Sequence, residues 1–327
     1  MATKTAKNVP SRSELRIGVS SCLLGEEVRY DGGHKLDHFL TDTLAAYVEF
    51  VEVCPEVGIG LGVPRETVRL VQIGTRVHMV AHKSGADHTA AMERFATKKA
   101  AELEALDLSG YVLKKDSPSC GMERVRVYDP ETGMPQKDGR GLFAAALMAR
   151  MPLLPVEEEG RLRDPRLREN FIERIFAYRR LKDLFAARWT RGDLVTFHTA
   201  HKLSLLAHDP PAYQTLGRLV ANAKETPRAE LAAEYQRVFM EALQKHASVR
   251  KQTNVLQHMA GYFKKVLDEA AKAELTQVID DYRQGLVPLI APLTLIRHYV
   301  RLHGVEYLRG QVYLEMHPRE LMLRYRV

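Results

Sequence analysis

The sequence predicts an α/β three-layer domain with a mainly parallel sheet, followed by an all-α helical bundle domain. The first half alternates short β-branched and apolar runs with helical stretches, which is the pattern of a parallel sheet covered by helices. The second half has helical periodicity almost throughout and is punctuated by prolines. At 327 residues the chain exceeds the roughly 100–200 residues of one domain, so two separate cores are expected.

The first domain is expected to occupy residues 15–155, after a flexible N-terminus at residues 1–14. Met151-Pro152 and the acidic run at 157–159 mark its end. The predicted elements are strands at 15–20, 50–54 and 111–113, a hairpin of 68–73 and 77–82 around Gly74, and helices at 36–47, 89–106 and 142–151.

The helical domain begins where Asp164 can cap a helix that has Pro165 in its first turn. We expect it to span residues 161–305, with a C-terminal tail at 306–327. The predicted helices lie at 165–187, 193–208, 211–223, 228–246, 253–268, 271–285 and 292–303.

Composition points to a globular protein of a reducing compartment. Apolar residues make up 45% of the chain and charged residues 27%. The first residues lack the apolar run of a signal peptide, and no segment approaches the roughly 20 apolar residues that cross a bilayer. We therefore expect a cytoplasmic protein. Its three cysteines are too few for a disulfide framework and are expected to be thiols or metal ligands.

Charge is concentrated in the helical half. Residues 161–265 contain 20 Lys and Arg against 10 Asp and Glu, a net charge of +10, whereas the whole chain carries +7 and the rest of it therefore −3. A basic module beside a slightly acidic one favours an anionic partner such as nucleic acid. A solvated helical surface is the alternative explanation.

Each cysteine falls where a predicted strand runs out: Cys22 two residues after the strand at 15–20, Cys54 at the end of the strand at 50–54, and Cys120 after a short loop. Loops at the carboxyl ends of parallel strands converge on one crevice, so three thiols far apart in sequence can meet there. Three thiolates around one point suit a soft metal or an iron–sulfur cluster. Their separations of 32 and 66 residues match no ferredoxin or zinc-finger spacing. The alternative is that all three are small buried hydrophobic residues.

The loops around the cysteines resemble the motifs of the thiouracil desulfurases. These motifs are VSSCLLG (19–25), VRYDG (28–32), VCPE (53–56) with GLGVPR (60–65), and KDSPSCG (115–121). The resemblance covers about residues 15–152. It implies a [4Fe-4S] cluster held by Cys22, Cys54 and Cys120, with a fourth iron that has no protein ligand.

The second half resembles a helical domain that is commonly fused to this desulfurase. The matching segments are FH (197–198), HKL (201–203), NVLQHMAGYF (254–263) and PLTL (292–295). The fused form is similar to the tRNA 4-thiouridine desulfidases. The resemblance therefore implies a tRNA that contains 4-thiouridine as substrate and partner.

Glu56 and Ser117 are the candidate catalytic residues. Glu56 lies two residues after Cys54 and can activate a water or carry its proton, and Ser117, three residues before Cys120, can orient substrate or relay a proton. The resemblance points to the same two residues. Glu56 could instead be a solvated or capping carboxylate, and Ser117 an ordinary turn residue. Ser20, Ser21 and Asp31 are possible substrate contacts, although Asp31 also suits a turn.

The helical domain offers candidates for RNA binding. Basic residues that could contact phosphate are Lys202, Arg250, Lys251, Lys264 and Lys265, and aromatic residues that could stack on bases, or else belong to the core, are Tyr213, Tyr262 and Phe263. His198, His201 and His208 share a predicted helix, and the first two have a spacing that can bind metal. With no third ligand nearby, packed or RNA-facing histidines are favoured.

Three functions are consistent with the sequence. The first is an iron–sulfur-dependent desulfidase that converts 4-thiouridine in tRNA to uridine, with water attacking C4 while the open iron binds the thiocarbonyl sulfur. The second is a desulfurase of free thiouracil or another small thiolated compound. The third is a non-catalytic RNA-binding protein with a structural metal. The sequence does not define an oligomeric state.

Overall fold

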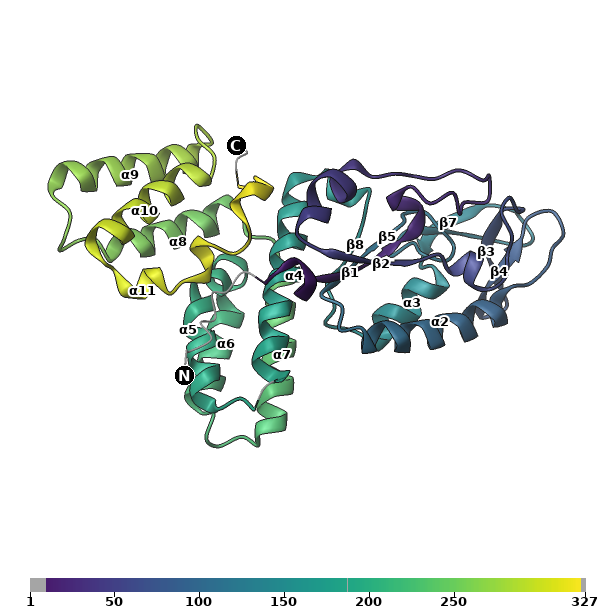
Figure 1. Ribbon diagram of the computed structural model, residues 1–327, viewed down its shortest axis with the longest axis horizontal. Helices are drawn as coiled ribbons and strands as arrows, with labels where there is room; N and C mark the ends of the chain where they lie inside the picture. The colour runs from purple at the N-terminus through teal and green to yellow at the C-terminus, as the bar shows by residue number, and fades with distance from the viewer. Residues whose placement is uncertain (1–9, 187, 325–327) are drawn as a thin grey trace. The chain divides into compact units, whose positions relative to one another are not determined.

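The chain folds into two compact units, Ser11–Asp164 and Pro165–Val327, in a computed structural model that describes residues 10–186 and 188–324 (Figure 1). Most of the predicted flexible N-terminus lies outside the described residues; within them, Arg12–Glu14 form a 3₁₀ turn. Among the described residues, no helix has both the length and the apolar content needed to cross a membrane.

The first unit contains the predicted parallel sheet. Its strands lie in the order β2 (Glu49–Val53), β1 (Arg16–Ser20), β5 (Gly110–Leu113) and β8 (Val156–Glu158), and every neighbouring pair is parallel. The α/β fold with a parallel sheet is therefore confirmed. Its central strands β1 and β5 are almost wholly buried, as expected for strands covered on both faces.

A second four-stranded sheet holds the predicted hairpin. It has the order β4 (Arg76–Ala81), β3 (Val68–Ile73), β6 (Val125–Tyr128) and β7 (Pro135–Gly139), and only the β3–β6 pair is parallel. The sequence did not predict β6 and β7. β7 is mostly exposed and reads PQKDG, so it lacks the apolar alternation that identifies a half-buried strand.

The sheet domain does not end before the acidic run at 157–159, because the last strand includes part of that run. Glu157 and Glu158 belong to β8, and Glu157, Glu158 and Glu159 are all buried. Their carboxylates have partners: Arg161 Nε lies 2.6 Å from Glu157, and the backbone N–H of Met122 donates to Glu158 at 2.7 Å. Buried glutamates are tolerated when they are paired in this way, which composition alone does not reveal.

Helices α2 (Thr89–Ala105) and α3 (Leu142–Arg150) pack side by side in the first unit (Figure 1). The Phe143 ring of α3 lies 5.9 Å from Tyr111 of β5 and 6.4 Å from Phe95 of α2, so aromatic contacts join the helices to the sheet. Gly18 on β1 is required beneath this layer, because a Cβ there would lie 2.1 Å from the Tyr111 ring.

The expected helix at 36–47 is only partly regular. Phe39–Thr43 form a π-type turn and Leu44–Ala46 a 3₁₀ turn, with Leu40 and Leu44 buried. The segment that precedes them is held elsewhere, because the backbone N–H groups of Lys35 and Asp37 donate to Cys22 and Leu23. The first turns of the expected helix are therefore replaced by a loop that runs beside Cys22.

The second unit is the predicted helical bundle. Its long helices are α4 (Pro165–Ala186), α5 (Arg191–His208), α6 (Pro210–Ala221), α7 (Arg228–Gln244), α8 (Val249–Gly261), α9 (Glu269–Gln284) and α10 (Ile290–His303). The prediction for α8 was displaced toward the C-terminus. Ser248 caps the helix by accepting a hydrogen bond from the Lys251 backbone, and the chain turns after Gly261.

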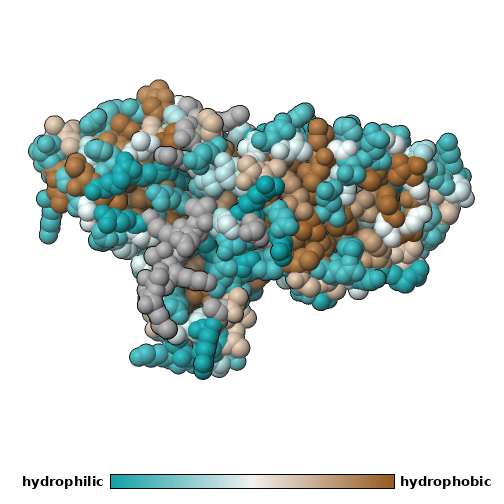
Figure 2. Space-filling view, in the orientation of Figure 1, coloured by the Kyte–Doolittle hydropathy of each residue, from teal (hydrophilic) through white to brown (hydrophobic). Residues whose placement is uncertain are grey.

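The C-terminal tail is part of the helical core. It forms α11 (Glu306–Arg309) and two 3₁₀ turns, Val312–Leu314 and Arg319–Leu321. Tyr313 and Leu308 are fully buried in the same cluster as residues of α8 and α10. On the face shown in Figure 2, hydrophilic side chains cover much of the molecule and the hydrophobic residues appear in patches between them.

Candidate functional site

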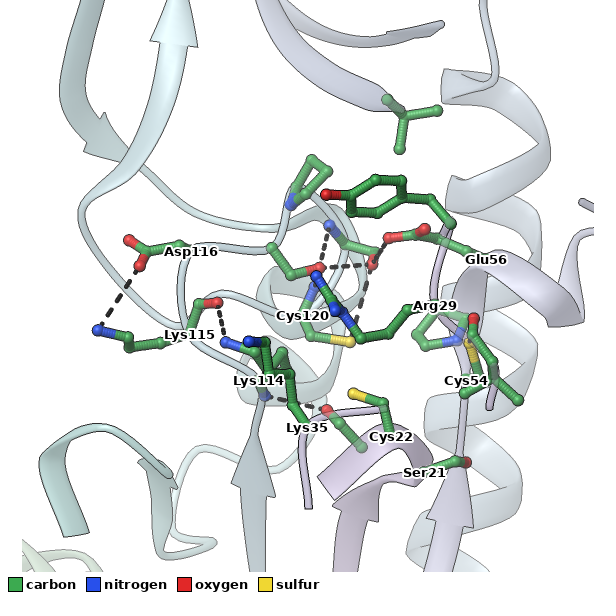
Figure 3. A pocket seen from close by; sticks show the side chains of 18 of the residues that line it. Ser21, Cys22, Arg29, Lys35, Cys54, Glu56, Lys114, Lys115, Asp116 and Cys120 are labelled. Atoms are coloured by element: carbon green, nitrogen blue, oxygen red, sulfur yellow. Dashed lines mark hydrogen bonds and ion pairs between the residues drawn. The ribbon is translucent and has the colours of Figure 1, made fainter. Parts of the chain in front are cut away.

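The three cysteines line one cavity of about 450 Å³. Cys22 lies in a 3₁₀ turn, Ser21–Leu24, directly after β1, and Cys54 caps the short helix α1 (Pro55–Gly58) directly after β2. Cys120 lies in the loop that follows β5. All three cysteines therefore follow neighbouring parallel strands at their carboxyl ends. Figure 3 shows Cys22 and Cys120 in the lower part of the cavity, Cys54 beside them and Glu56 above.

Burial keeps these thiols protonated when no metal is bound. It raises the pKa of Cys22 to about 11, with the nearby Lys114 ammonium opposing the shift. It raises the pKa of Cys120 to about 12, although hydrogen bonds from Ser20 and Ser119 oppose it, and it also raises the pKa of Cys54. A metal must therefore displace protons to bind here, so its affinity will depend on pH.

Glu56 lines the same cavity and both of its carboxylate oxygens are held. Arg65 donates to Oε2 from Nε at 3.1 Å and from Nη2 at 2.7 Å. Ser119 Oγ donates to Oε1 at 2.8 Å. Arg65 also donates to the carbonyl oxygens of Gly62 and Val28, each at 3.0 Å. One buried guanidinium thus joins three segments around the cavity.

Ser117 is hydrogen-bonded within its own loop and to Ser119. Its Oγ accepts from the backbone N–H groups of Ser119 at 3.3 Å and Cys120 at 3.1 Å, and lies 2.9 Å from Ser119 Oγ. The loop is tightly wound, because a Cβ at Gly141 would lie 2.4 Å from the Ser119 carbonyl oxygen. Backbone N–H groups at the start of α3 donate to that same carbonyl. This arrangement fixes the loop that carries Cys120.

The other predicted substrate contacts, Ser20, Ser21 and Asp31, do not all line the cavity. Ser20 and Ser21 line the cavity and are buried, and Ser20 Oγ accepts from the Lys114 backbone at 3.0 Å. Asp31 is exposed and is not among the lining residues. It accepts from the Gly33 backbone at 3.2 Å and pairs with Arg29 at 3.0 Å, so it forms a turn rather than a wall of the cavity.

Sequence analysis missed three side chains of the site. Arg65 and Ser119 occur inside the recognised motifs but had no assigned role, and Glu159 was assigned to the domain boundary. Glu159 accepts from Lys114 Nζ and from the Lys115 backbone N–H, each at 2.8 Å. The signal available for Arg65 and Ser119 was their place in the motifs. Nothing in the sequence distinguished Glu159 from a surface glutamate.

The three histidines of α5 are packed inside the bundle. His198, His201 and His208 are each at most 2% exposed, so they do not face RNA. His201 stacks on Phe197 with a centroid distance of 4.0 Å, and His208 Nε2 lies 3.0 Å from Glu173. Within residues 10–186 and 188–324, no three His, Cys, Asp or Glu side chains come close enough to hold a single metal ion.

The candidate RNA contacts are only partly accessible. Arg250, Lys264 and Lys265 are exposed and Lys202 is half-buried. Lys251 Nζ donates to the His208 carbonyl oxygen at 2.6 Å, so its charge already stabilises the C-terminal end of α5. Of the aromatic candidates, Phe263 is core, Tyr213 is half-buried, and the exposed Tyr262 stacks on Tyr307 with centroids 4.8 Å apart.

The donor set fits an iron–sulfur cluster. Single ions such as zinc need thiolates within about 2.3 Å of one point, whereas a cluster is larger and spaces its thiolates further apart. Three soft donors from three separate loops line one cavity, which is the donor chemistry that an iron–sulfur cluster takes. Cys22, Cys54 and Cys120 are the residues that would hold such a group.

The parallel-sheet domain gathers three thiols and a glutamate at the carboxyl ends of its strands, where ligands bind in open α/β sheets. The family model described as 2-thiouracil desulfurase matches residues 17–159, and that of a protein of unknown function, DUF1722, matches residues 202–318. The chain therefore belongs to the 2-thiouracil desulfurase family and joins that domain to a helical DUF1722 domain.

Each individual relative matches about half of this chain or less. The uncharacterized protein YbgA of Escherichia coli is 37% identical over 161 residues, which are 49% of this chain and 95% of YbgA. The uncharacterized protein YbbK of Bacillus subtilis is 31% identical over 134 residues, 39% of this chain and 87% of YbbK. A solved structure of the [4Fe-4S]-dependent thiouracil desulfidase TudS is 35% identical and covers 46% of this chain and 94% of its own, with a TM-score of 0.37.

Proposed function

We propose that this protein is an iron–sulfur-dependent desulfidase and that its substrate is 4-thiouridine in tRNA, which it converts to uridine. The observation that carries the proposal is the meeting of Cys22, Cys54 and Cys120 around one cavity that Glu56 also lines. Structural cysteines have no need of a shared cavity with a carboxylate. Membership of the 2-thiouracil desulfurase family supports the same chemistry.

The reaction needs one water and no change of oxidation state. Water adds to C4 of the thiolated ring, the carbon–sulfur bond breaks, and oxygen replaces sulfur, which leaves as sulfide. When bound, a [4Fe-4S] cluster with three thiolate ligands supplies an open iron that binds the soft thiocarbonyl sulfur and makes C4 more electrophilic. The chain has to supply the remaining functions, which are to position the ring and to take a proton from the water.

Glu56 is the residue proposed to take that proton. Its Oε1 and Oε2 are held by Ser119 and Arg65, so the carboxylate has a fixed place in the cavity wall. General bases of this kind contribute roughly 10²–10⁴-fold to a rate. Ser20 and Ser21 line the same cavity and are proposed to contact the substrate or the cluster sulfurs. Asp31 is not one of the proposed substrate contacts, since its carboxylate is exposed and does not line the cavity.

Charge on the helical unit supports RNA as the carrier of the base. Residues 161–265 carry a net charge of +10. Arg174, Arg179 and Arg180 are buried, whereas Arg250, Lys264 and Lys265 present exposed cationic side chains that can attract an anion. Arg250 lies in the first turn of α8, which has no acidic residue. Phosphate contacts can hold the RNA while the thiolated base is unstacked and enters the cavity.

Two experiments test the proposal. Anaerobic purification should give a coloured protein with about four iron and four sulfide per chain. Turnover is then compared on 4-thiouridine-containing tRNA and on free 4-thiouracil, and we expect clear preference for the tRNA. Equal or better turnover of the free base would favour the small-molecule desulfurase.

The non-catalytic alternative has its own test. If the cluster were structural in an RNA-binding protein, Glu56→Ala would leave every measurable function intact. Retention of tRNA binding together with loss of sulfide release in this variant would instead support catalysis at Glu56.

A further inference from the structure

The hydroxyl of Ser119 forms its hydrogen bonds with side chains of the site and not with the backbone of its own loop. Its Oγ lies within hydrogen-bond distance of Glu56 Oε1 at 2.8 Å, Ser117 Oγ at 2.9 Å and, more weakly, the Cys120 sulfur at 3.7 Å. In the part of the chain that the structure describes, no backbone hydrogen bond to this Oγ is recorded, and the residue is 1% exposed. Ser117 makes the loop's backbone contacts instead.

The direction of this hydrogen-bond chain follows from the number of protons available. A serine hydroxyl has one donor and two acceptor sites. The backbone N–H groups of Ser119 and Cys120 occupy both acceptor sites of Ser117 Oγ. Ser117 must therefore donate its proton to Ser119, and Ser119 then donates its own proton to Glu56. The chain runs one way, from Ser117 through Ser119 to the carboxylate.

The same counting defines what remains free on Glu56. An ionised carboxylate has about four acceptor sites, two on each oxygen. Arg65 fills both sites on Oε2 through Nε and Nη2. Ser119 fills one site on Oε1. One acceptor site is left, on the oxygen that Ser119 holds, and Glu56 lines the cavity into which a water or substrate would come.

Resting on the proposed function, we propose that Ser119 and Arg65 are positioning residues that clamp the two oxygens of Glu56, so that a single acceptor site on Oε1 faces the reacting water. Ser117 acts on this clamp through Ser119, in addition to fixing its own loop. Arg65 also links the clamp to the loop over the cavity, because it donates to the Val28 carbonyl oxygen at 3.0 Å. The Cys54 thiol lies 3.8 Å from that same carbonyl, so the clamp and a proposed ligand share one anchor.

The test uses the full-length, cluster-loaded protein and the substitution Ser119→Ala. Loss of a residue that orients a site group typically costs roughly 10–100-fold, so we expect kcat to fall by that factor while KM changes less than about twofold. Iron per chain should equal that of the unsubstituted protein. The matched control is Ser84→Ala, which removes an exposed serine–glutamate hydrogen bond between the turn after β4 and Glu66, and it should leave kcat unchanged.

A combined variant separates positioning from an independent role. Glu56→Gln/Ser119→Ala should be no slower than Glu56→Gln, because both substitutions act on the same carboxylate. Losses that multiply in this double variant would overturn the proposal. Loss of iron from Ser119→Ala would overturn it as well, since the hydroxyl would then support the cluster.

A crystal structure of the Ser119→Ala variant provides a measurement without substrate. We expect the Glu56 carboxylate to pivot about the oxygen that Arg65 holds and to occupy more than one orientation. A single orientation identical to that of the unsubstituted protein would overturn the proposal. This measurement also separates the two ideas. If no thiolated uracil is a substrate, the proposed function is wrong, yet the position of Glu56 still decides whether Ser119 fixes it.

Discussion

The cysteine-lined cavity and the histidine-rich helix α5 both collect potential metal ligands, but only the cavity arranges them as a site. His198 and His201 are three residues apart on one helix, yet Tyr235, Phe197 and Phe239 surround their rings. Cys22 and Cys120 are far apart in the chain, yet they line one cavity. Spacing along a helix therefore says less about ligation here than position at the ends of parallel strands.

The difference also concerns how the charges are used. In the helical unit, Glu173 is paired with Arg324 at 2.8 Å and His208 at 3.0 Å, and all three are buried. The polar groups of these three side chains therefore have their partners inside the protein. In the cavity, Cys22 and Cys120 are buried and Cys54 is half-buried, and the sulfurs of Cys120 and Cys54 have only weak contacts, at 3.7 and 3.8 Å. Buried groups that are paired stabilise a fold, whereas groups at a cavity that lack strong partners are available to bind a ligand.

The largest expected effect is the loss of the cluster from cysteine variants. Cys54→Ala should abolish both iron retention and desulfidation, because two thiolates cannot replace three. His201→Phe, which replaces a ring that stacks on Phe197 and meets Phe239 edge-on, should leave iron content unchanged. Iron and sulfide analysis after anaerobic purification measures both. Iron lost from the histidine variant but kept in the cysteine variant would reverse the comparison.

Next in size is the effect of neutralising Glu56. Glu56→Gln keeps the shape and the hydrogen bonds to Ser119 and Arg65 in part, but removes the base. We expect kcat to fall by roughly 10²–10⁴-fold with unchanged cluster absorbance. Single-turnover rates on thiolated tRNA provide the measurement, and a variant with full activity would exclude Glu56 as the base.

Breaking the buried network of the helical unit should affect stability rather than chemistry. Arg324→Met leaves the Glu173 and Glu169 carboxylates without their guanidinium partner. Removing one partner of a buried pair typically costs about 3–5 kcal/mol, measured as the free energy of unfolding in urea. The control Arg237→Met breaks the exposed ion pairs with Glu234 and Glu241 and should change the free energy of unfolding far less. Equal costs would show that the network adds nothing to the bundle.

The two regions should also differ in how their stability depends on pH. Burial lowers the pKa of His198 to about 4 and that of His201 to about 3, from 6.5. Below pH 6.5 the unfolded chain binds protons that the folded helical unit does not, so stability should fall from pH 6.5 toward pH 4, by on the order of 3 kcal/mol per histidine.

The stability of the cluster-free first unit should instead fall at alkaline pH. The pKa values of Cys22 and Cys120, about 11 and about 12, lie above the ordinary 9.0. The unfolded chain therefore loses protons above pH 9 that the folded unit retains, and stability should fall as pH rises. Thermal unfolding of cluster-free protein between pH 4 and pH 11 would show both slopes. A flat alkaline limb would mean that the thiols are less buried than the structure places them.

Local patterns in the sequence were sufficient for most of the fold. Strand β1 and helix α2 were predicted within one residue at each end, because buried β-branched runs and helical periodicity are short-range signals. Strand β7 was missed since it is polar, and β8 since its glutamates resemble a linker. Both depend on partners elsewhere in the chain, Val125–Tyr128 for β7 and Gly110–Leu113 for β8.

For the site, the sequence by itself determined which loops carry Cys22, Cys54 and Cys120 and placed Glu56 and Ser117 beside them, because these residues are neighbours along the chain. Only the tertiary structure decided which atoms meet. It joined Glu56 to Ser119 across 63 residues, gave Glu56 a guanidinium partner, and used His201 as packing. Hydrogen bonds and burial are set by contacts between distant segments, and a single sequence contains no direct record of those distances.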